Sequence, residues 1–508
     1  MTGIFTRPRA LSVLPRGTQT TAVSVLVAAI SLATISPARA ADQPDFSVVK
    51  KVQRNQVAFR EEASTLPDGT NYLIRVPEKW NGILIRDLDY AQRVSQAARM
   101  ARYDRLLEHG YALAGTARHP LRAWQYDPAR EISNLDLVLD KFEASFKKPE
   151  YVIQFGCSGG GHVSLAVAED FHERIDGSVV MSGHTPVWLM NTFLDGWFAL
   201  QTLLGEYYED ADYGPASDLI IIGLANDGTA NATGHGVEGK VPKAWRHAFD
   251  AANASEKGRA RMALAFAVAQ WPIWMADGIP LPEYSDLKAV QNSIFQSLQR
   301  LSGSPGGEAR ILFENAAQGQ QLSWNDSVDY QAYFDNANAS LRSSVEQLYA
   351  DAGLNLKSDI QRLNSAPGVL ASQHALDYWG AKGRTVVGKP AIPVFRLHGL
   401  GDYQIPYTLM LGYEQAVKKN QAGDLLRTAL IKSTGHCTES AISTAESSAA
   451  IEVMMQRLKN GSWPKTDATA LNQLARSLDD SSARFIEPAN YSIDIYNRLW
   501  VPSSHKED

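Results

Sequence analysis

The chain has little of what several large protein classes require. It contains only 2 cysteines in 508 residues, too few for a four-cysteine zinc site or an iron–sulfur cluster. Its 49 Lys and Arg are outnumbered by 55 Asp and Glu, giving a formal net charge of −6, so it has no basic excess to attract the phosphates of a nucleic acid. We therefore expect no metal, no cofactor and no nucleic-acid partner.

Long apolar runs are also lacking, except near the N-terminus. Three arginines within the first sixteen residues precede an apolar run at 22–35, and Ala38-Arg39-Ala40 follows. A basic start, an apolar run shorter than the roughly 20 residues of a membrane span and small residues at the end are typical of a secretory signal peptide. We predict a signal peptide over 1–40, cleaved after Ala40, and a secreted or periplasmic protein without a membrane span. The alternative is an uncleaved anchor.

Short apolar runs alternate with segments of helical periodicity in two blocks of the chain. Such alternation is typical of an α/β protein with a mainly parallel sheet and crossover helices. The expected strands are 73–77, 82–88, 111–117, 151–156 and 177–183 in the first block, and 392–399 and 426–432 in the second. The expected helices are 91–109, 132–146, 407–419 and 439–459.

The two blocks are separated by a segment that is poor in strand signals. It has helical periodicity and holds seven of the eleven tryptophans, which favours a helical lid with an aromatic-walled pocket. We predict a signal peptide at 1–40, a core at 41–186, a lid at 187–386, the rest of the core at 387–465 and a C-terminal extension at 466–508.

One turn of the first block has the sequence of a nucleophile elbow. Gly156-Cys157-Ser158-Gly159-Gly160 matches G-x-S-x-G between an expected strand and an expected helix, which is where α/β-hydrolases present a nucleophilic serine. A Cβ at the motif glycines is expected to collide with neighbouring backbone. The amide of Gly159, at the start of the helix, is the first expected oxyanion donor. The alternative is a glycine-rich turn that packs closely or binds phosphate.

The second block supplies an acid and a base in the order that this fold uses. Asp402 follows the strand at 392–399, and His436 follows the strand at 426–432. We predict that His436 takes the Ser158 proton and that Asp402 orients the imidazole. Asp424 is the rival acid. His162 and His398 flank the site and are expected to hold loops.

The two cysteines are adjacent in sequence to the proposed nucleophile and base. Cys157 precedes Ser158, and Cys437 follows His436. If Ser158 and His436 are within hydrogen-bonding reach, their neighbours are close enough for a disulfide, which an oxidising compartment favours. The alternative is two buried free thiols.

These motifs together resemble the tannase and feruloyl esterase group of secreted α/β-hydrolases. The resemblance rests on Cys157-Ser158, Asp402 and His436-Cys437, and on Pro77-Glu78-Lys79-Trp80-Asn81-Gly82, which is similar to that group's P-x-x-W-N-G segment. It implies a Ser158–His436–Asp402 triad, a disulfide between the flanking cysteines and ester hydrolysis under a large lid. The group's calcium-binding loop has no counterpart in this lid, which supports the expectation of no metal.

The segment after the expected oxyanion strand departs from that group, which usually has glycine there. It reads Asp87-Leu88-Asp89-Tyr90 and puts two carboxylates where negative charge should develop. Either the carboxylates point away and a backbone amide at Leu88 or Asp89 is the second oxyanion donor, or an Asp contacts the substrate. We predict Leu88 as the donor, with Asp87, Asp89 and Tyr90 as candidate substrate contacts.

The leading hypothesis is a serine hydrolase that cleaves a carboxylic ester through an acyl-enzyme. The ester is a small molecule or an oligomer, and an aromatic ester is a candidate. An amide, carbamate, lactone or β-diketone substrate is the alternative, because a triad defines the nucleophile and not the acyl group. A non-catalytic binding protein of the same fold is the hypothesis from another class. A metal-dependent hydrolase is disfavoured by the absence of H-E-x-x-H. No oligomeric state is predicted.

Overall fold

The computed structural model describes residues 50–54, 57–93, 97–122, 124–208, 240–302, 312–487 and 496–505, so the predicted signal peptide lies outside the described residues. Within these ranges, ten strands form one sheet in the order β1-β2-β3-β5-β4-β6-β7-β8-β9-β10. The strands are β1 (Lys50–Arg54), β2 (Val57–Thr65), β3 (Asn71–Pro77), β4 (Ile83–Asp87), β5 (Ala112–Thr116), β6 (Tyr151–Cys157), β7 (Gly177–Met181), β8 (Val394–Gly399), β9 (Leu426–Ile431) and β10 (Phe485–Ile486).

The centre of the sheet is parallel and its edges are antiparallel. The neighbours β5, β4, β6, β7, β8 and β9 pair in parallel, whereas β1, β2 and β3 pair antiparallel with their neighbours and β10 pairs antiparallel with β9. This strand order, with an elbow after β6, is that of the α/β-hydrolase fold. The carboxyl ends of the parallel strands therefore share one edge, where α/β proteins place their sites.

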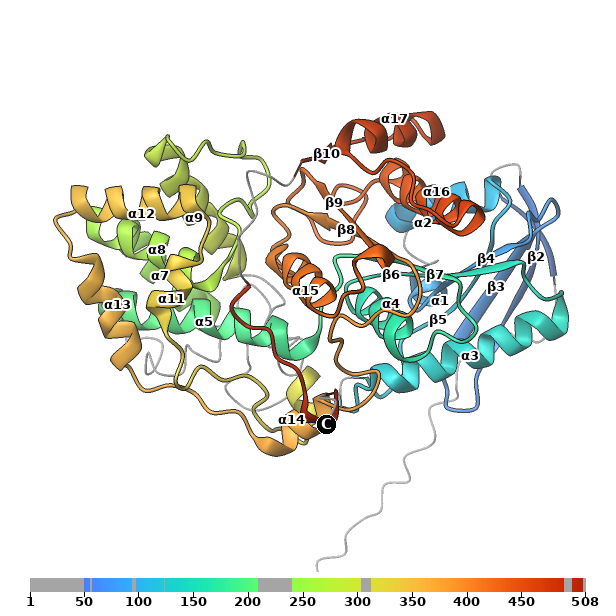
Figure 1. Ribbon diagram of the computed structural model, residues 1–508, viewed down its shortest axis with the longest axis horizontal. Helices are drawn as coiled ribbons and strands as arrows, with labels where there is room; N and C mark the ends of the chain where they lie inside the picture. The colour runs from blue at the N-terminus through green and yellow to red at the C-terminus, as the bar shows by residue number, and fades with distance from the viewer. Residues whose placement is uncertain are drawn as a thin grey trace, which may run out of the picture. The chain divides into compact units, whose positions relative to one another are not determined.

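Helices cover both faces of the sheet (Figure 1). The helices α3 (Pro128–Ser145), α4 (Gly159–Asp170) and α15 (Thr408–Lys419) pack in one hydrophobic cluster with alternate strand residues such as Val152 and Val180. The helices α2 (Ala97–Glu108) and α16 (Thr444–Asn460) pack on the other face with the residues in between, such as Ile153 and Val179. The two-residue period of a strand thus fills both hydrophobic layers.

Between β7 and β8 the chain forms a helical insertion, and its described residues contain no strand. Its helices are α5 (Pro186–Leu204), α7 (Lys240–Asn253), α8 (Glu256–Ala269), α9 (Leu287–Leu301), α11 (Tyr330–Asp335), α12 (Ala339–Asp351), α13 (Leu356–Ser365) and α14 (Gln373–Trp379). Nearly every residue of α5 is buried, as expected for a helix that is apolar on all sides.

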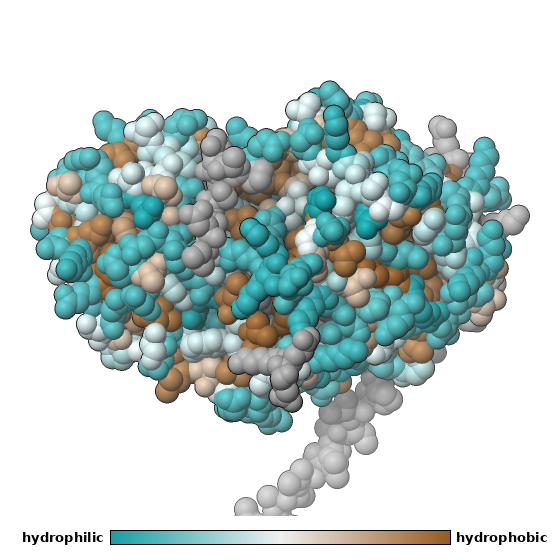
Figure 2. All heavy atoms as spheres, viewed as in Figure 1, coloured by the Kyte–Doolittle hydropathy of each residue, from teal (hydrophilic) through white to brown (hydrophobic). Residues whose placement is uncertain are grey.

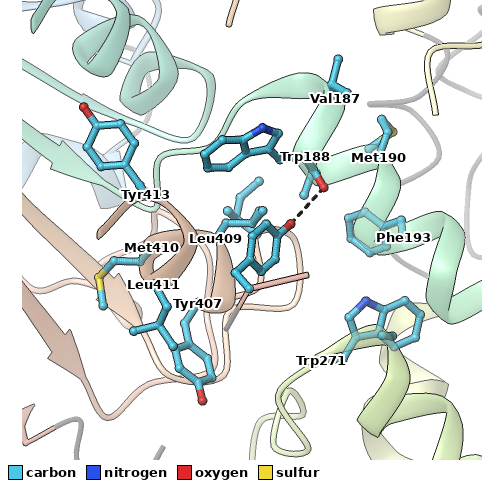
Figure 3. Packing of buried hydrophobic residues seen from close by; sticks show 14 of the residues in the cluster. Val187, Trp188, Met190, Phe193, Trp271, Tyr407, Leu409, Met410, Leu411 and Tyr413 are labelled. Carbon is cyan, nitrogen blue, oxygen red and sulfur yellow. Dashed lines mark hydrogen bonds between the residues drawn. The ribbon is translucent and has the colours of Figure 1, made fainter. Parts of the chain in front are cut away.

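Helix α5 joins the insertion to the rest of the chain. Figure 3 shows Trp188 near Leu409 of α15, while Phe193, further along α5, lies beside Trp271 of the insertion, with ring centroids 6.0 Å apart. Most tryptophans of the insertion pack in its core: the Trp197 ring lies 5.4 Å from that of Trp245. The expected aromatic wall is therefore mainly a packed core, although Trp271 and Trp274 line a described cavity.

Several boundaries differ from the predicted ones for local reasons. The strands β1, β2 and β10 were not predicted. Residues 59–65 of β2 pair with β3 and its first residues pair with β1, so sheet pairing rather than the mixed pattern of its side chains defines the strand. The helix expected from residue 439 begins at Thr444, because Ser443 and Glu446 form a capping box that satisfies the first free amides of the helix.

Hydrophilic residues predominate on the visible face of the protein, with hydrophobic residues in scattered groups between them (Figure 2). Within the described ranges, no helix combines the length and the apolarity that crossing a membrane requires.

The C-terminal extension first joins the sheet and then contacts the insertion. After α17 (Ala468–Leu478), β10 adds to the edge of β9. Further along, Tyr496 Oη donates to the carbonyl of Trp188 at 3.3 Å, and Arg498 forms an ion pair of 3.0 Å with Asp195 of α5. The two charged side chains are only 6% and 2% exposed, so each depends on the other for compensation.

We expect Arg498→Met to destabilise the protein by ~3–5 kcal/mol, because it leaves the Asp195 carboxylate buried without its cation. Adding Asp195→Asn should recover much of the loss. Urea unfolding midpoints measure both effects. The matched control is Arg174→Met, which removes an exposed pair with Asp140 and should cost less than ~1 kcal/mol; equal losses for the two arginines would contradict the role of the buried pair.

Candidate active site

The loops that carry the predicted residues all follow parallel strands. Ser158 follows β6, Leu88 follows β4, Asp402 lies in the loop after β8, and His436 lies in the loop after β9. Because these strands are parallel neighbours, the loops meet at one edge of the sheet. Residues up to 348 positions apart in sequence are brought to this edge by strand order alone.

Ser158 has the backbone conformation of a nucleophile elbow. Its φ of 61° lies in the left-handed region, which is unusual for a residue other than glycine and marks functional sites. A Cβ at Gly156 would lie 2.4 Å from the carbonyl oxygen of Gly160, so this glycine is required. The collision expected at Gly160 is wrong, because a Cβ there would lie 3.5 Å from its nearest neighbour, an atom of the Asp89 side chain. A Cβ on the next residue, Gly161, would collide, since it would lie 2.7 Å from the carbonyl oxygen of Met181.

The imidazole of His436 is paired with Asp402. Its Nδ1 lies 2.8 Å and 3.0 Å from the two carboxylate oxygens. Asp402 is fully buried and also accepts from the backbone amides of Gln404 and Ile405. Burial by itself raises the pKa of Asp402, but His436 and the Ile405 amide outweigh it and hold the pKa below its ordinary value. A charged acceptor on Nδ1 leaves Nε2 as the nitrogen for proton exchange.

The rival acid and the flanking histidines are placed differently. Asp424 lies exposed in a turn at Gly423–Leu425, away from the imidazole, which is bonded to Asp402. His398 is buried, and its Nε2 lies 2.7 Å from the carbonyl of Ile405, so it holds the loop of Asp402. His162 is buried on α4, and burial lowers its pKa to about 3.

The insertion supports the loops of the acid and the base. A Cβ at Gly401 would lie 1.9 Å from the carbonyl oxygen of Trp274, so the Asp402 loop packs directly against insertion backbone. Thr434, two residues before His436, donates to Asp277 of the insertion, and Asp277 is also paired with Arg300. The insertion thus contacts both loops.

A disulfide joins the two cysteines. Cys157 and Cys437 are 280 residues apart in sequence, with Cα atoms 5.9 Å apart. The Nε2 of His436 lies 3.5 Å from Cys437 Sγ. Because Cys157 directly precedes Ser158, the covalent link ties the loop of His436 to the elbow.

The acidic segment after β4 is buried and paired. Asp87 accepts from Tyr103 Oη at 2.6 Å and from the amide of Asp89 at 3.0 Å. Tyr90 is 1% exposed and its ring packs edge-on against Tyr103. The amide of Asp89 is occupied by Asp87, so Leu88 is the candidate that is left as second oxyanion donor, and its role stays a prediction.

The structure adds Arg118, which the sequence analysis missed. Arg118 follows β5 at the same edge and binds Asp89 with two nitrogens, Nε to Oδ1 at 2.5 Å and Nη2 to Oδ2 at 2.9 Å. Its guanidinium nitrogens lie 3.1 Å from where a Cβ of Gly159 would be. The signal that could have found it is the acidic segment itself, because buried carboxylates require a partner, and the loop after the neighbouring strand has an arginine as its second residue.

The fold, the elbow at Ser158 and the buried acid–histidine pair define the protein as a hydrolase of the α/β-hydrolase type. The o-phthalyl amidase of Xanthobacter agilis is 58% identical over 447 residues, which are 88% of this chain and 98% of that protein. The chain therefore belongs to the family of this amidase.

Solved structures of similar fold are more distant. Feruloyl esterase B from Aspergillus oryzae is 13% identical, with a TM-score of 0.39, over 84% of this chain and 85% of that chain. Candida antarctica lipase A is 13% identical, with a TM-score of 0.37, over 85% and 90%. No known family model matches the chain. Membership of the tannase and feruloyl esterase group stays a prediction.

We expect Gly156→Ala to abolish hydrolysis and to destabilise the fold by at least ~1–3 kcal/mol, because its Cβ meets backbone that cannot move aside. Gly160→Ala is the matched control: its Cβ meets only an ordinary contact, so stability should change by less than ~1 kcal/mol. Thermal unfolding and turnover of an activated ester measure both. A larger loss at position 160 than at 156 would show that this account of the elbow is wrong.

We expect removal of the disulfide by Cys157→Ala/Cys437→Ala to cost about 2–5 kcal/mol of stability and to lower kcat, because the loop of His436 is then no longer tied to the elbow. Dithiothreitol should reproduce both effects in the wild type and change nothing in the double variant. Unchanged urea midpoint and kcat in the variant would contradict the prediction.

Proposed function

We propose that this protein is a serine hydrolase with Ser158 as nucleophile, His436 as general acid and base, and Asp402 as the residue that orients His436. The observation that carries the proposal is the Asp402–His436 pair, joined through Cys437 and Cys157 to the serine of the elbow. A serine hydroxyl needs a base that is itself oriented. The Asp402–His436 pair supports the proposal on both points, since it offers a base and a group that orients the base.

In the proposed reaction, Ser158 Oγ attacks the substrate carbonyl carbon while His436 Nε2 takes the hydroxyl proton. The tetrahedral oxyanion receives hydrogen bonds from the amides of Gly159 and Leu88. Cleavage of the bond to the leaving group, which takes its proton from His436, forms an acyl-enzyme. Water then attacks, His436 accepts a proton and returns it to Ser158, and the carboxylic acid leaves.

The family relationship favours an amide as the bond that is cleaved. The relative with 58% identity is named an o-phthalyl amidase, and we infer that this chain cleaves amides of an o-phthalyl or similar aromatic acyl group. A carboxylic ester of the same acyl group is the second candidate, because the acyl-enzyme is the same and an alkoxide is an easier leaving group than an amide nitrogen.

We also infer export to the periplasm or medium. The disulfide supports this location, because paired thiols persist in oxidising compartments, and the predicted signal peptide at 1–40 supplies the route. N-terminal sequencing of the exported protein tests it: a start at Ala41 is expected, and a retained N-terminus would contradict it.

Ser158→Ala should lower kcat/KM for phthalyl anilides and for p-nitrophenyl esters by at least about 10⁴-fold, because it removes the nucleophile. A fluorophosphonate should label Ser158 in the wild type and not in the variant. Ser182, a residue with positive φ at the end of the neighbouring strand, offers the matched control Ser182→Ala, which should still be labelled. A wild type that neither reacts nor hydrolyses would favour the binding-protein hypothesis.

A further inference from the structure

Arg118 lies directly beside the residue that follows the proposed nucleophile. Two of its guanidinium nitrogens, Nη1 and Nη2, lie 3.1 Å from the position that a Cβ of Gly159 would occupy. Glycine leaves this space open, so the guanidinium covers the start of α4. The amide of Gly159 is the proposed oxyanion donor, which puts a fixed positive charge next to the place of reaction.

The hydrogen bonds of Arg118 leave one nitrogen unused. Nε and Nη2 are taken by the two carboxylate oxygens of Asp89. Nη1 is buried and, in the described part of the structure, has no hydrogen-bond partner. The side chain as a whole is only 12% exposed. A buried N–H of a cation that has lost water without gaining a partner is costly, and an anionic ligand would satisfy it.

The other carboxylates of this region direct their oxygens to different donors. Asp87 accepts from Tyr103 and from the amide of Asp89. Glu131 accepts from the amide of His119 through Oε1, while its Oε2 is buried and, among the described residues, has no hydrogen-bond partner. None of these carboxylates forms a hydrogen bond with Nη1 in the described part of the structure.

We propose that Arg118 binds, through Nη1, a carboxylate that the substrate carries on the ring carbon next to the one bearing the scissile carbonyl; this inference rests on the proposed function. When that carbonyl carbon is at Ser158 Oγ and its oxygen faces the amide of Gly159, an ortho substituent falls beside Gly159, where Nη1 lies. A para carboxylate points away from this position. Arg118 is therefore the residue that selects o-phthalyl groups.

The test compares kcat/KM of the wild type and Arg118→Gln on 2-carboxybenzanilide, 4-carboxybenzanilide and benzanilide. We expect the ratio of kcat/KM on the ortho acid to kcat/KM on each of the other two amides to fall at least about 100-fold in the variant, which is ~2.7 kcal/mol. Equal losses on all three amides would overturn the proposal, because they would mean that Arg118 supports the site or the oxyanion irrespective of the ortho carboxylate.

Two controls separate contact from charge. Arg122→Gln removes the same charge from the same loop, where Arg122 lies over the Tyr126 ring at 5.1 Å, and should leave the ratio of ortho acid to benzanilide unchanged. A matching fall in that ratio would overturn direct binding in favour of a long-range field. Because Arg118→Gln leaves Asp89 uncompensated, the comparison is repeated as Arg118→Gln/Asp89→Asn against Asp89→Asn, where the same selective loss is expected.

A binding measurement does not depend on turnover, and a conservative variant keeps the proposal testable if Arg118→Gln fails to fold. Calorimetry with phthalate and with benzoate is done on Ser158→Ala and on Ser158→Ala/Arg118→Lys, which keeps a cation beside Asp89 but loses the fork. From the single to the double variant, the affinity for phthalate should fall at least tenfold and the affinity for benzoate should not. Equal phthalate affinities of the two variants would overturn the proposal. Failure of the proposed function is distinguishable, because the wild type would then neither hydrolyse the amides nor react with fluorophosphonate.

Discussion

The parallel pairing of the central strands is the constraint on which the rest of this structure depends. Because β4 to β9 run in the same direction, the loops that follow them meet at one edge, and hydrogen-bonded backbone holds their starting points. The contacts at that edge include a histidine–carboxylate pair, an arginine–carboxylate pair and a disulfide, and each joins two segments at the ends of different strands. Each can form only because the sheet has already brought its two ends together.

The sequence was sufficient to predict the parts of the fold that follow from local chemistry. The elbow at Ser158 and the parallel strands depend on turn geometry and apolar periodicity, which are visible in a single chain. The pairing of Cys157 with Cys437 was predictable because each cysteine is adjacent in sequence to a proposed catalytic residue. The edge strands β1 and β2 were missed because their side chains are mixed and their pairing is a tertiary property. The insertion was expected as helical, but its tryptophans were assigned to a pocket; most fill its core, because burying aromatic area stabilises a packed helical layer more than lining a cleft does.

The contact that the C-terminal extension makes with the insertion could not be predicted from the sequence. Nothing local in Arg498 distinguishes it from a surface arginine, and its significance comes from Asp195, 303 residues earlier, which is the one charged residue of the buried helix α5. A carboxylate on such a helix requires a partner from elsewhere in the chain. The extension supplies it and, with β10 on the sheet, contacts both halves of the fold.

The acidic segment after β4 follows the same logic at the site. Two carboxylates next to a forming oxyanion would oppose the reaction if their charges faced it. The protein instead directs Asp87 to Tyr103 and Asp89 to Arg118. The pairing with Asp89 uses only one edge of the guanidinium and fixes its plane, so the remaining Nη1 is held rigidly beside Gly159. In the proposed role of Arg118, a carboxylate that looked unfavourable for catalysis in the sequence orients a cation toward the substrate, and a rigid donor discriminates among acyl groups better than a mobile one.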